Sequence, residues 1–538
     1  MSGLFGIASS ALKANQQALA TVGQNIANVN TPGYARQRVE FTTGQGDGGG
    51  VNVSRIERSY SEWTTQALRR AQQDSGAAVS QATFLSSLES AIAPGDGGLG
   101  SAMSQYFDAF SDLAAQPTVR GVRAAALEDA RALAERFKSL DGQLADLELS
   151  MRSELKGTAS RINLLTKQLA ELNQIVQVSG LSPAVQDRQE QLLSELSFEV
   201  EIDVRPSSAG TVDVFLPAGL ALTRGNQSFE LAQVDVSLGS RNSPLRLEGT
   251  GRDPTLLLEK GRLGGLLRAR EETLLPLRRD LGRLAEAFAR RANEIHSAGF
   301  TAAGIKGGLL FGGNQTAVNA ISDPSNTGGA LVTATIEDAR ASRSSAYLLS
   351  KQGAEFVLTR QSDGTEIFRG SETDLAAGTF DGMRLAIESG AVNAGDRFVV
   401  DPFLGAAGRL EVVLATPDEL AFNRPSPDDE DQSAGAADGG QAALLGEDVA
   451  IFATGERGSE AYAELVGTAG AASRQAQTSQ EVAALSLTEA TARRENFAGV
   501  NLDEEAADLI RFQQAYQAAA RIINTADTIF QTILAAVR

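Results

Sequence analysis

The final stretch of the chain, residues 502–537, constrains the fold more than any other. Apolar side chains recur there at alternating steps of three and four residues: Leu509, Phe512, Tyr516, Ala519, Ile523, Ala526, Phe530, Ile533 and Val537. No Gly or Pro interrupts this heptad seam, which is typical of a long α-helix. Asn501 is the expected N-cap, with Glu504 completing a capping pair. Because packing supplies most of a helix's stability, this helix needs a partner.

The N-terminal stretch carries a second seam. The same alternating spacing of three and four residues connects Phe5, Ala8, Leu12, Asn15, Leu19, Val22, Ile26 and Val29. Asn15 is the polar position, and a buried Asn fixes the register of a coiled coil at some cost in stability. We therefore expect the two terminal helices to pack on each other as a stalk that presents the rest of the chain. The alternative is that each helix docks separately onto the body.

Composition narrows the classes of partner. The 538 residues are enough for three or four domains of roughly 150 residues. A net charge of -19 argues against nucleic acid and anionic membranes, and the absence of cysteine excludes disulfides and thiolate metal sites. The N-terminus lacks the basic region followed by an apolar region that is typical of a signal peptide. No run of residues is long and apolar enough to span a membrane.

A sharp turn is expected after the first helix. Pro32 disfavours a helical conformation at Thr31, and Pro32-Gly33 suits the centre of a type II turn. The turn motif comprises Asn28, Asn30, Thr31, Pro32, Gly33 and Tyr34. Alternating residues in 36–43 and 51–56 then predict two strands.

The middle of the chain changes period several times. Helical spacing covers 60–92, 101–113, 130–176, 183–196, 256–295 and 459–497. The seam of the third helix resumes one residue late after Met151, which predicts local unwinding there, and Pro276 interrupts the fifth. Strands are expected at 198–204, 211–216 and in short segments from 331 to 414, whereas 424–440 is expected to be an acidic, solvated loop.

These patterns predict a mainly α protein with inserted β domains. The expected division is a terminal coiled-coil domain (1–35 with 500–538), a helical body (36–197 with 256–300 and 441–499), a small β insertion (198–255) and an outer β insertion (301–440).

No residue pattern predicts catalysis, a cofactor or a metal. Two glycine runs have dinucleotide-loop spacing, but neither lies between a buried strand and a helix: Gly44-x-Gly46-x-x-Gly49 and Gly95-x-Gly97-x-x-Gly100. The only histidine, His296, is expected to be a surface residue at a helix C-terminus. The only tryptophan, Trp63, is expected to be a core anchor. An enzyme is therefore not predicted.

Several motifs carry a resemblance to a known family. Gly3-Leu-Phe, the helix 18–27 and the turn motif continuing to Arg36 resemble the axial proteins of the bacterial flagellum, which are its rod, hook and hook-associated proteins. The segments 499–505 and 511–516 resemble the first hook-associated proteins, the FlgK family. Further similarity lies in 188–196, 264–267, 284–288 and 296–300. The β insertions match no pattern.

The resemblance implies a function outside the cell. Such a subunit leaves through the flagellar type III export apparatus without a cleaved signal peptide, and it self-associates as a ring between hook and filament. Its implied neighbours are the hook subunit and the second hook-associated junction protein, and a cytoplasmic chaperone holds the C-terminal helix before export. The terminal seams are then the assembly surface.

Two alternatives remain open from the sequence. One is another axial protein, such as the hook subunit or the second junction protein, although the length and Val500-Asn-Leu-Asp-Glu-Glu505 disfavour it. The other is an unrelated coiled-coil surface protein, or an enzyme with a buried site.

Overall fold

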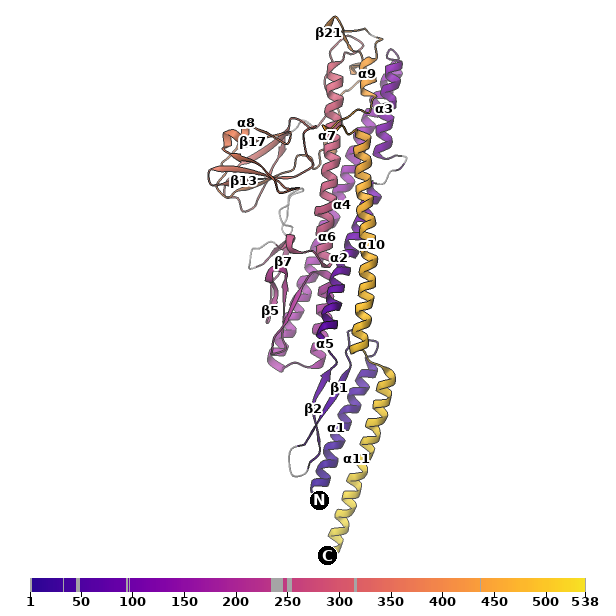
Figure 1. Ribbon diagram of the computed structural model, residues 1–538, viewed down its shortest axis with the longest axis vertical. Helices are drawn as coiled ribbons and strands as arrows, with labels where there is room; N and C mark the ends of the chain where they lie inside the picture. The colour runs from indigo at the N-terminus through magenta and orange to yellow at the C-terminus, as the bar shows by residue number, and fades with distance from the viewer. Residues whose placement is uncertain are drawn as a thin grey trace.

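The chain forms a long rod with β units along one side (Figure 1). The computed structural model describes residues 2–31, 33–44, 49–92, 95, 97–233, 245–248, 254–313, 317–435 and 437–537. Both termini lie at one end of the rod, and a small hairpin lies at the other. Within the described residues, no helix combines the length and the hydropathy that crossing a membrane requires.

A two-helix stalk forms the terminal end of the rod. α1 (Ser2–Ala27) packs along α11 (Leu502–Val537), and the helices run antiparallel (Figure 1). The hairpin of β1 (Gln37–Thr43) and β2 (Val51–Arg58) lies against α1. The predicted pairing of the terminal helices is therefore confirmed, and separate docking onto the body is wrong.

Helices make up the body. The long ones are α2 (Glu62–Ile92), α3 (Leu99–Ala115), α4 (Arg120–Ser179), α5 (Pro183–Glu199) and α10 (Gly458–Ala498), and α9 (Gly440–Leu445) is short. α10 packs along α2, and α3 packs against α4. The two glycine runs fall in the β1–β2 and α2–α3 connections, and residues 45–48 and 96 of them lie outside the described set.

α4 is one continuous helix of 60 residues, so the local unwinding predicted near Met151 does not interrupt it. Glu148 lies three residues before Met151 and is fully buried. Its carboxylate accepts from Arg278 Nη1 at 2.6 Å and from Arg270 Nη2 at 3.1 Å. The buried ion pairs thus link α4 to the segment that carries Arg270 and Arg278.

Pro276 is accommodated by a turn of π-helix. α6 (Gly261–Arg268), a π-helical segment (Ala269–Leu274) and α7 (Leu275–Ala298) follow one another without a gap. The wider turn accommodates the missing amide hydrogen of a proline. This helix was expected from Leu256 and begins later because Gly261 has a φ of +72°.

A small β unit covers one side of α4. Its strands are β3 (Asp203–Pro206), β4 (Val212–Leu216), β5 (Leu220–Arg224), β6 (Gln227–Ser228), β7 (Leu231–Gln233) and β8 (Leu245–Leu247). The first four form one antiparallel sheet in chain order, and the last two pair with each other. The strand expected from Phe198 starts later because α5 continues to Glu199.

An outer β unit has its own core. In one sheet the strands lie in the order β10 (Val318–Asn319), β12 (Leu331–Ile336), β17 (Met383–Ser389) and β16 (Thr379–Phe380). In the other sheet the order is β11 (Ile321–Ser322), β18 (Arg397–Val400), β13 (Tyr347–Gln352), β14 (Glu355–Arg360) and β15 (Glu366–Gly370). One short helix, α8 (Glu372–Ala377), follows β15. Leu349, Phe356 and Phe398 belong to this second core.

The range 301–440 contributes to both cores. β9 (Phe311–Gly312) pairs with β19 (Glu411–Val412), and Phe311 and Phe403 are part of the large helical core. β20 (Pro425–Ser426) and β21 (Asp429–Ser433) form the hairpin at the distal tip, where an acidic loop was expected.

Two single residues differ from expectation. His296 is buried, with Nδ1 donating to the carbonyl of Gly308 at 2.8 Å and Nε2 accepting from the Ala421 amide at 2.9 Å. It is therefore a structural link and not a surface residue. Trp63 is 66% exposed, with the Arg493 guanidinium 6.0 Å from its ring centroid, so it is not a core anchor.

Candidate assembly site

Small side chains form the interface between the stalk helices. The buried residues of α1 are Ala8, Ala14, Ala18, Thr21, Val22 and Asn25, and those of α11 are Glu505, Ala519 and Ala526. Alanines let helix backbones approach closely, but they bury little apolar area. The interface is therefore flat, and its only charged buried side chain is Glu505 among the described residues of the two helices.

The predicted seam residues lie mostly beside this flat strip. Leu12, Leu19 and Ile26 on α1, Val29 just after it, and Leu509, Phe512 and Ile523 on α11 are half-buried, and Val22 is buried. Phe5, Tyr516, Phe530 and Ile533 are exposed. The side chain of Val537 lies outside the described set. The role of these residues in assembly remains a prediction.

Asn15 does not link the two helices. It is half-buried, and its Nδ2 donates to the carbonyl of Ala11 in its own helix at 2.8 Å. The expectation that Asn15 fixes the register is therefore wrong.

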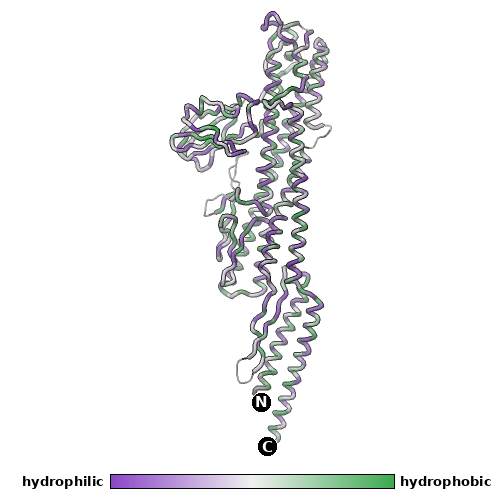
Figure 2. Tube along the Cα trace, in the orientation of Figure 1, coloured by the Kyte–Doolittle hydropathy of each residue, from purple (hydrophilic) through white to green (hydrophobic). Residues whose placement is uncertain are grey.

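The free end of the stalk is apolar and uncovered. α11 has 36 residues and α1 has 26, so α11 extends past the start of α1 (Figure 1). Exposed side chains there include Phe5 (52%), Ile529 (44%), Phe530 (51%) and Ile533 (45%). Residues 2–12 and 528–537 contain no charged side chain. Figure 2 shows hydrophobic segments continuing along both helices toward their ends.

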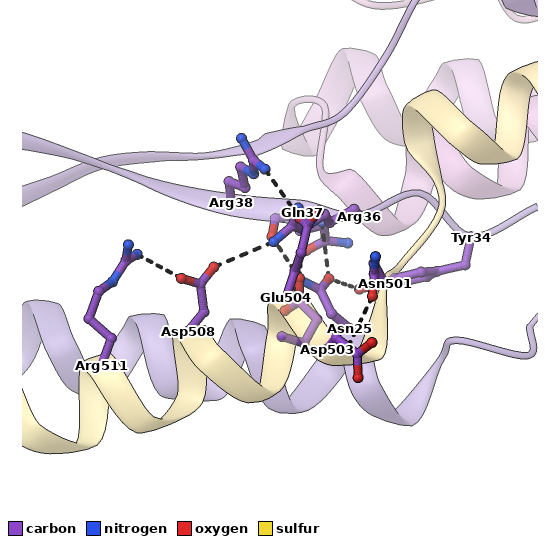
Figure 3. A network of polar contacts seen from close by, with 11 residues as sticks. Asn25, Tyr34, Arg36, Gln37, Arg38, Asn501, Asp503, Glu504, Asp508 and Arg511 are labelled. Atoms are coloured by element: carbon purple, nitrogen blue, oxygen red, sulfur yellow. Dashed lines mark hydrogen bonds and ion pairs between the residues drawn. The ribbon is translucent and has the colours of Figure 1, made fainter.

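A polar joint lies at the other end of the stalk (Figure 3), and Asn25 is its centre. The Asn25 amide donates to Glu505 Oε2 at 2.9 Å and to the carbonyl of Gln37 at 2.9 Å. Its Oδ1 accepts from the Gln37 amide at 3.0 Å and from the Tyr34 hydroxyl at 2.9 Å. Both donors and both acceptor sites of this buried side chain are thus used.

Arg36 connects the joint to α10 and α11. Its Nε donates to Glu505 Oε1 at 2.6 Å, and its Nη atoms pair with Glu504 and with Asp508. Its backbone amide donates to the carbonyl of Ala498, the last residue of α10, at 2.8 Å. One residue therefore bonds the end of one helix through its backbone and the start of the next through its side chain.

The start of α11 differs in part from expectation. The Asn501 side chain accepts from the Asp503 amide at 3.0 Å, so its N-cap role is confirmed. Glu504 does not complete a capping pair, because its carboxylate turns to Arg36 (Figure 3).

The turn motif positions the joint. The Tyr34 amide donates to the carbonyl of Thr31 at 3.2 Å, and Gly33 has a φ of +83°, as the second central position of a type II turn requires. Pro32 lies outside the described residues, and Asn30 is exposed. Burial, together with Asp187 and Glu505 nearby, raises the pKa of Tyr34 to about 12, so the hydroxyl stays protonated and donates to Asn25.

Sequence reasoning missed the three residues that make the joint. Asn25, Arg36 and Glu505 all lie in segments that the family resemblance covers, but no local pattern pairs residues so far apart in the chain. Among the described residues, no group of three His, Asp or Glu side chains is placed to hold a metal ion.

Comparisons with known proteins match these same parts. The sequence models that match are the flagellar hook-associated protein FlgK helical domain (85–311), the flagellar hook-associated protein 1 D2-like domain (321–402), the flagella basal body rod protein (5–34) and the flagellar basal body rod FlgEFG protein C-terminal (495–536). Flagellar hook-associated protein 1 of Escherichia coli is 31% identical over 99% of this chain and 100% of its own length. The chain belongs to the flagellar hook-associated protein 1 family.

More distant relatives match most of the chain. Flagellar hook-associated protein 1 of Bacillus subtilis is 24% identical over 97% of this chain and 96% of its own length. The flagellar hook junction protein FlgK of Burkholderia pseudomallei shares the fold, with a TM-score of 0.72, 22% identity and coverage of 80% of this chain and 99% of that chain. A member of the hook-associated protein 1 family is a structural component of the flagellum at the hook–filament junction and not an enzyme.

Proposed function

We propose that this chain assembles as a ring between hook and filament through its α1–α11 stalk. The observation that carries the proposal is the uncovered apolar end of that stalk, where Phe5, Phe530 and Ile533 are about half exposed. Burying a side chain of this size stabilises by roughly 1.5–3 kcal/mol. In a ring the same contact recurs at every subunit, so small gains per subunit add up.

The terminal segments also indicate which neighbours the ring meets. Residues 5–34 and 495–536 match models of rod-type axial proteins, whereas the middle of the chain matches hook-associated protein 1 models. A stalk of the shared type can stack on the hook subunit on one side and on the second junction protein on the other. The family-specific body then distinguishes this ring from its neighbours.

The same apolar end requires protection before assembly. An exposed and uncharged apolar helix face favours aggregation in the cytoplasm. We therefore include in the proposal an export chaperone that covers the C-terminal helix, and passage through the flagellar type III apparatus without a cleaved signal peptide. The subunit then acts outside the cell.

The test replaces both Phe530 and Ile533 by Asp. A carboxylate in a dry contact loses its hydration, so subunits should no longer join. Cells that carry Phe530→Asp/Ile533→Asp should make hooks without filaments and release flagellin into the medium. The thermal unfolding of the purified variant should match that of the parent, because neither side chain is buried in the monomer.

A matched control is Val178→Asp with Ile305→Asp, since these side chains are 80% and 66% exposed on the body. This control should assemble normally. The test variant must be detected outside the cell, so that failed assembly is separated from failed export. Normal swimming by cells with the test variant would contradict the proposal.

A further inference from the structure

The polar joint and the apolar seam contribute differently to the stalk. The seam supplies burial, but its contacts repeat along each helix and therefore specify the position of one helix against the other weakly. Ala11, Ala18 and Asn25 share one heptad position on α1, and Glu505, Phe512, Ala519 and Ala526 share one on α11. A slip by one heptad would exchange Ala11 for Ala18 on α1 and Ala519 for Ala526 on α11, so the alanine part of the interface does not oppose it.

Packing next to the joint is also incomplete. A hollow of about 460 Å³ lies between α1, β1 and α11, and its lining includes Ala18, Val22, Phe41 and Phe512. Tight interdigitation of large side chains would resist sliding, but a flat alanine strip beside a hollow does not.

The joint, by contrast, exists in one position only. Glu505 is 1% exposed and Asn25 is 1% exposed, and each satisfies the other. After a slip of one heptad, Glu505 would face Ala18, and its buried carboxylate would lose Asn25 and Arg36 together. A buried charge without partners is strongly unfavourable, and a buried polar contact is the best-attested device for fixing helix register.

We infer that Asn25, Arg36 and Glu505 form a register lock that sets the position of α11 along α1. The lock also fixes where the apolar end of α11 projects, because α11 is a single helix from the joint to its free end. Subunits with a slipped α11 would present different ends to a neighbour. The inference concerns the single chain and does not depend on ring formation.

The test measures the register directly in the full chain. The sequence contains no cysteine, so Gln24→Cys and Gln517→Cys, both at exposed positions, introduce two unique spin-label sites on α1 and α11. Pulsed electron spin resonance then gives the distribution of distances between the labels. We expect one narrow distance in the parent.

The decisive variant is Asn25→Leu with Glu505→Leu. It replaces the buried polar pair by apolar side chains of similar size, and Arg36 keeps Glu504 and Asp508 as partners. We expect a second population whose distance differs by up to about 10 Å, the rise of seven helical residues. Glu505→Gln, which keeps the acceptor for Asn25, should retain the parent distance.

The control is Val22→Ala, which weakens the apolar contact and leaves the joint intact. It should keep the parent distance. An unchanged single distance in Asn25→Leu/Glu505→Leu would overturn the inference. So would a broad distribution in the parent, or detachment of α11 in place of slipping, because detachment would mean that the joint supplies affinity and not register.

Discussion

At the scale of single residues, buried polar side chains define how distant segments of this protein meet. His296 joins α7 to the segments around Gly308 and Ala421 through both ring nitrogens. Nε2 can accept from the Ala421 amide only while the ring is neutral. Burial lowers the pKa of His296, partly offset by its hydrogen bond to Gly308. The neutral ring is thus a condition for this connection.

The first residue-scale prediction concerns pH. The folded pKa of His296 lies below its unfolded value of about 6.5, so the unfolded state binds the proton more readily and the stabilisation is lost as pH falls below that value. We expect His296→Asn to lower the free energy of unfolding by about 1–3 kcal/mol at pH 8. The difference from the parent should shrink at pH 5.5.

Comparing the parent with the variant at each pH cancels the contribution of other groups. Burial raises the pKa of Asp280 and Glu286, and their stabilising contributions change with pH in the opposite direction. Denaturant unfolding of both proteins at the two pH values provides the measurement. A difference that stays constant with pH would show that His296 does not titrate as its burial implies.

At the scale of elements, buried ion pairs link the longest helix to the segments that pack against it. α4 has an apolar seam on both sides of Met151, and the two halves are out of step by one residue. Burial alone would raise the pKa of Glu148, but Arg270, Arg278 and Arg152 outweigh it and the pKa is lowered. Glu148 therefore stays ionised and bridges the step, because it reaches the π-helical segment and α7 together.

The element-scale prediction compares two glutamates of α4. Glu148→Ala removes the partner that the buried Arg270 and Arg278 share and leaves them with Glu271 and Asp141, and breaking a buried ion pair costs up to about 3–5 kcal/mol. Glu128→Ala removes only the exposed pair with Arg131 at 2.6 Å, which contributes about 0–1 kcal/mol. Denaturant unfolding of the two variants should show this contrast. Similar losses in both would mean that the apolar seam alone sustains α4.

At the scale of the whole molecule, the rod and the outer β unit are stabilised by separate cores. The helical core extends from α2 to α10, and the second core lies within residues 330–400. The segment 321–399 begins and ends side by side, since Ile321 pairs with Val399. Assembly is proposed to depend on the stalk, which lies at the opposite end of the rod from the distal hairpin (Figure 1).

The whole-molecule prediction removes the outer β unit. Replacing 322–398 by a short Gly-Ser linker should leave the helical body folded, because its core keeps Phe311 and Phe403 and loses only Ile336 and Ala339. The thermal unfolding curve should lose the signal of the outer β unit and keep the main transition of the helical body. The shortened chain should also restore filaments to cells that lack the protein. Loss of the main transition would show that the two cores fold as one unit.

The sequence by itself determined the elements that depend on local pattern. Heptad spacing identified both terminal helices and their pairing, the Pro32-Gly33 turn ended the first helix, and changes of period marked the β units. These features depend on side chains that lie close together in the chain, so a short stretch of sequence is enough to predict them. The family motifs also lie in such short stretches.

Tertiary structure alone decided which residues meet. The heptad seam of the first helix does not include Asn25, and no local pattern indicated that Arg36 would pair with Glu505. The sequence also predicted that His296 lies on the surface and Trp63 in the core, and both predictions were wrong. Periodicity reports that a helix has an apolar face, but not which neighbour covers each part of it. The burial of a polar side chain depends on partners supplied by distant segments, and those partners exist only once the chain has folded.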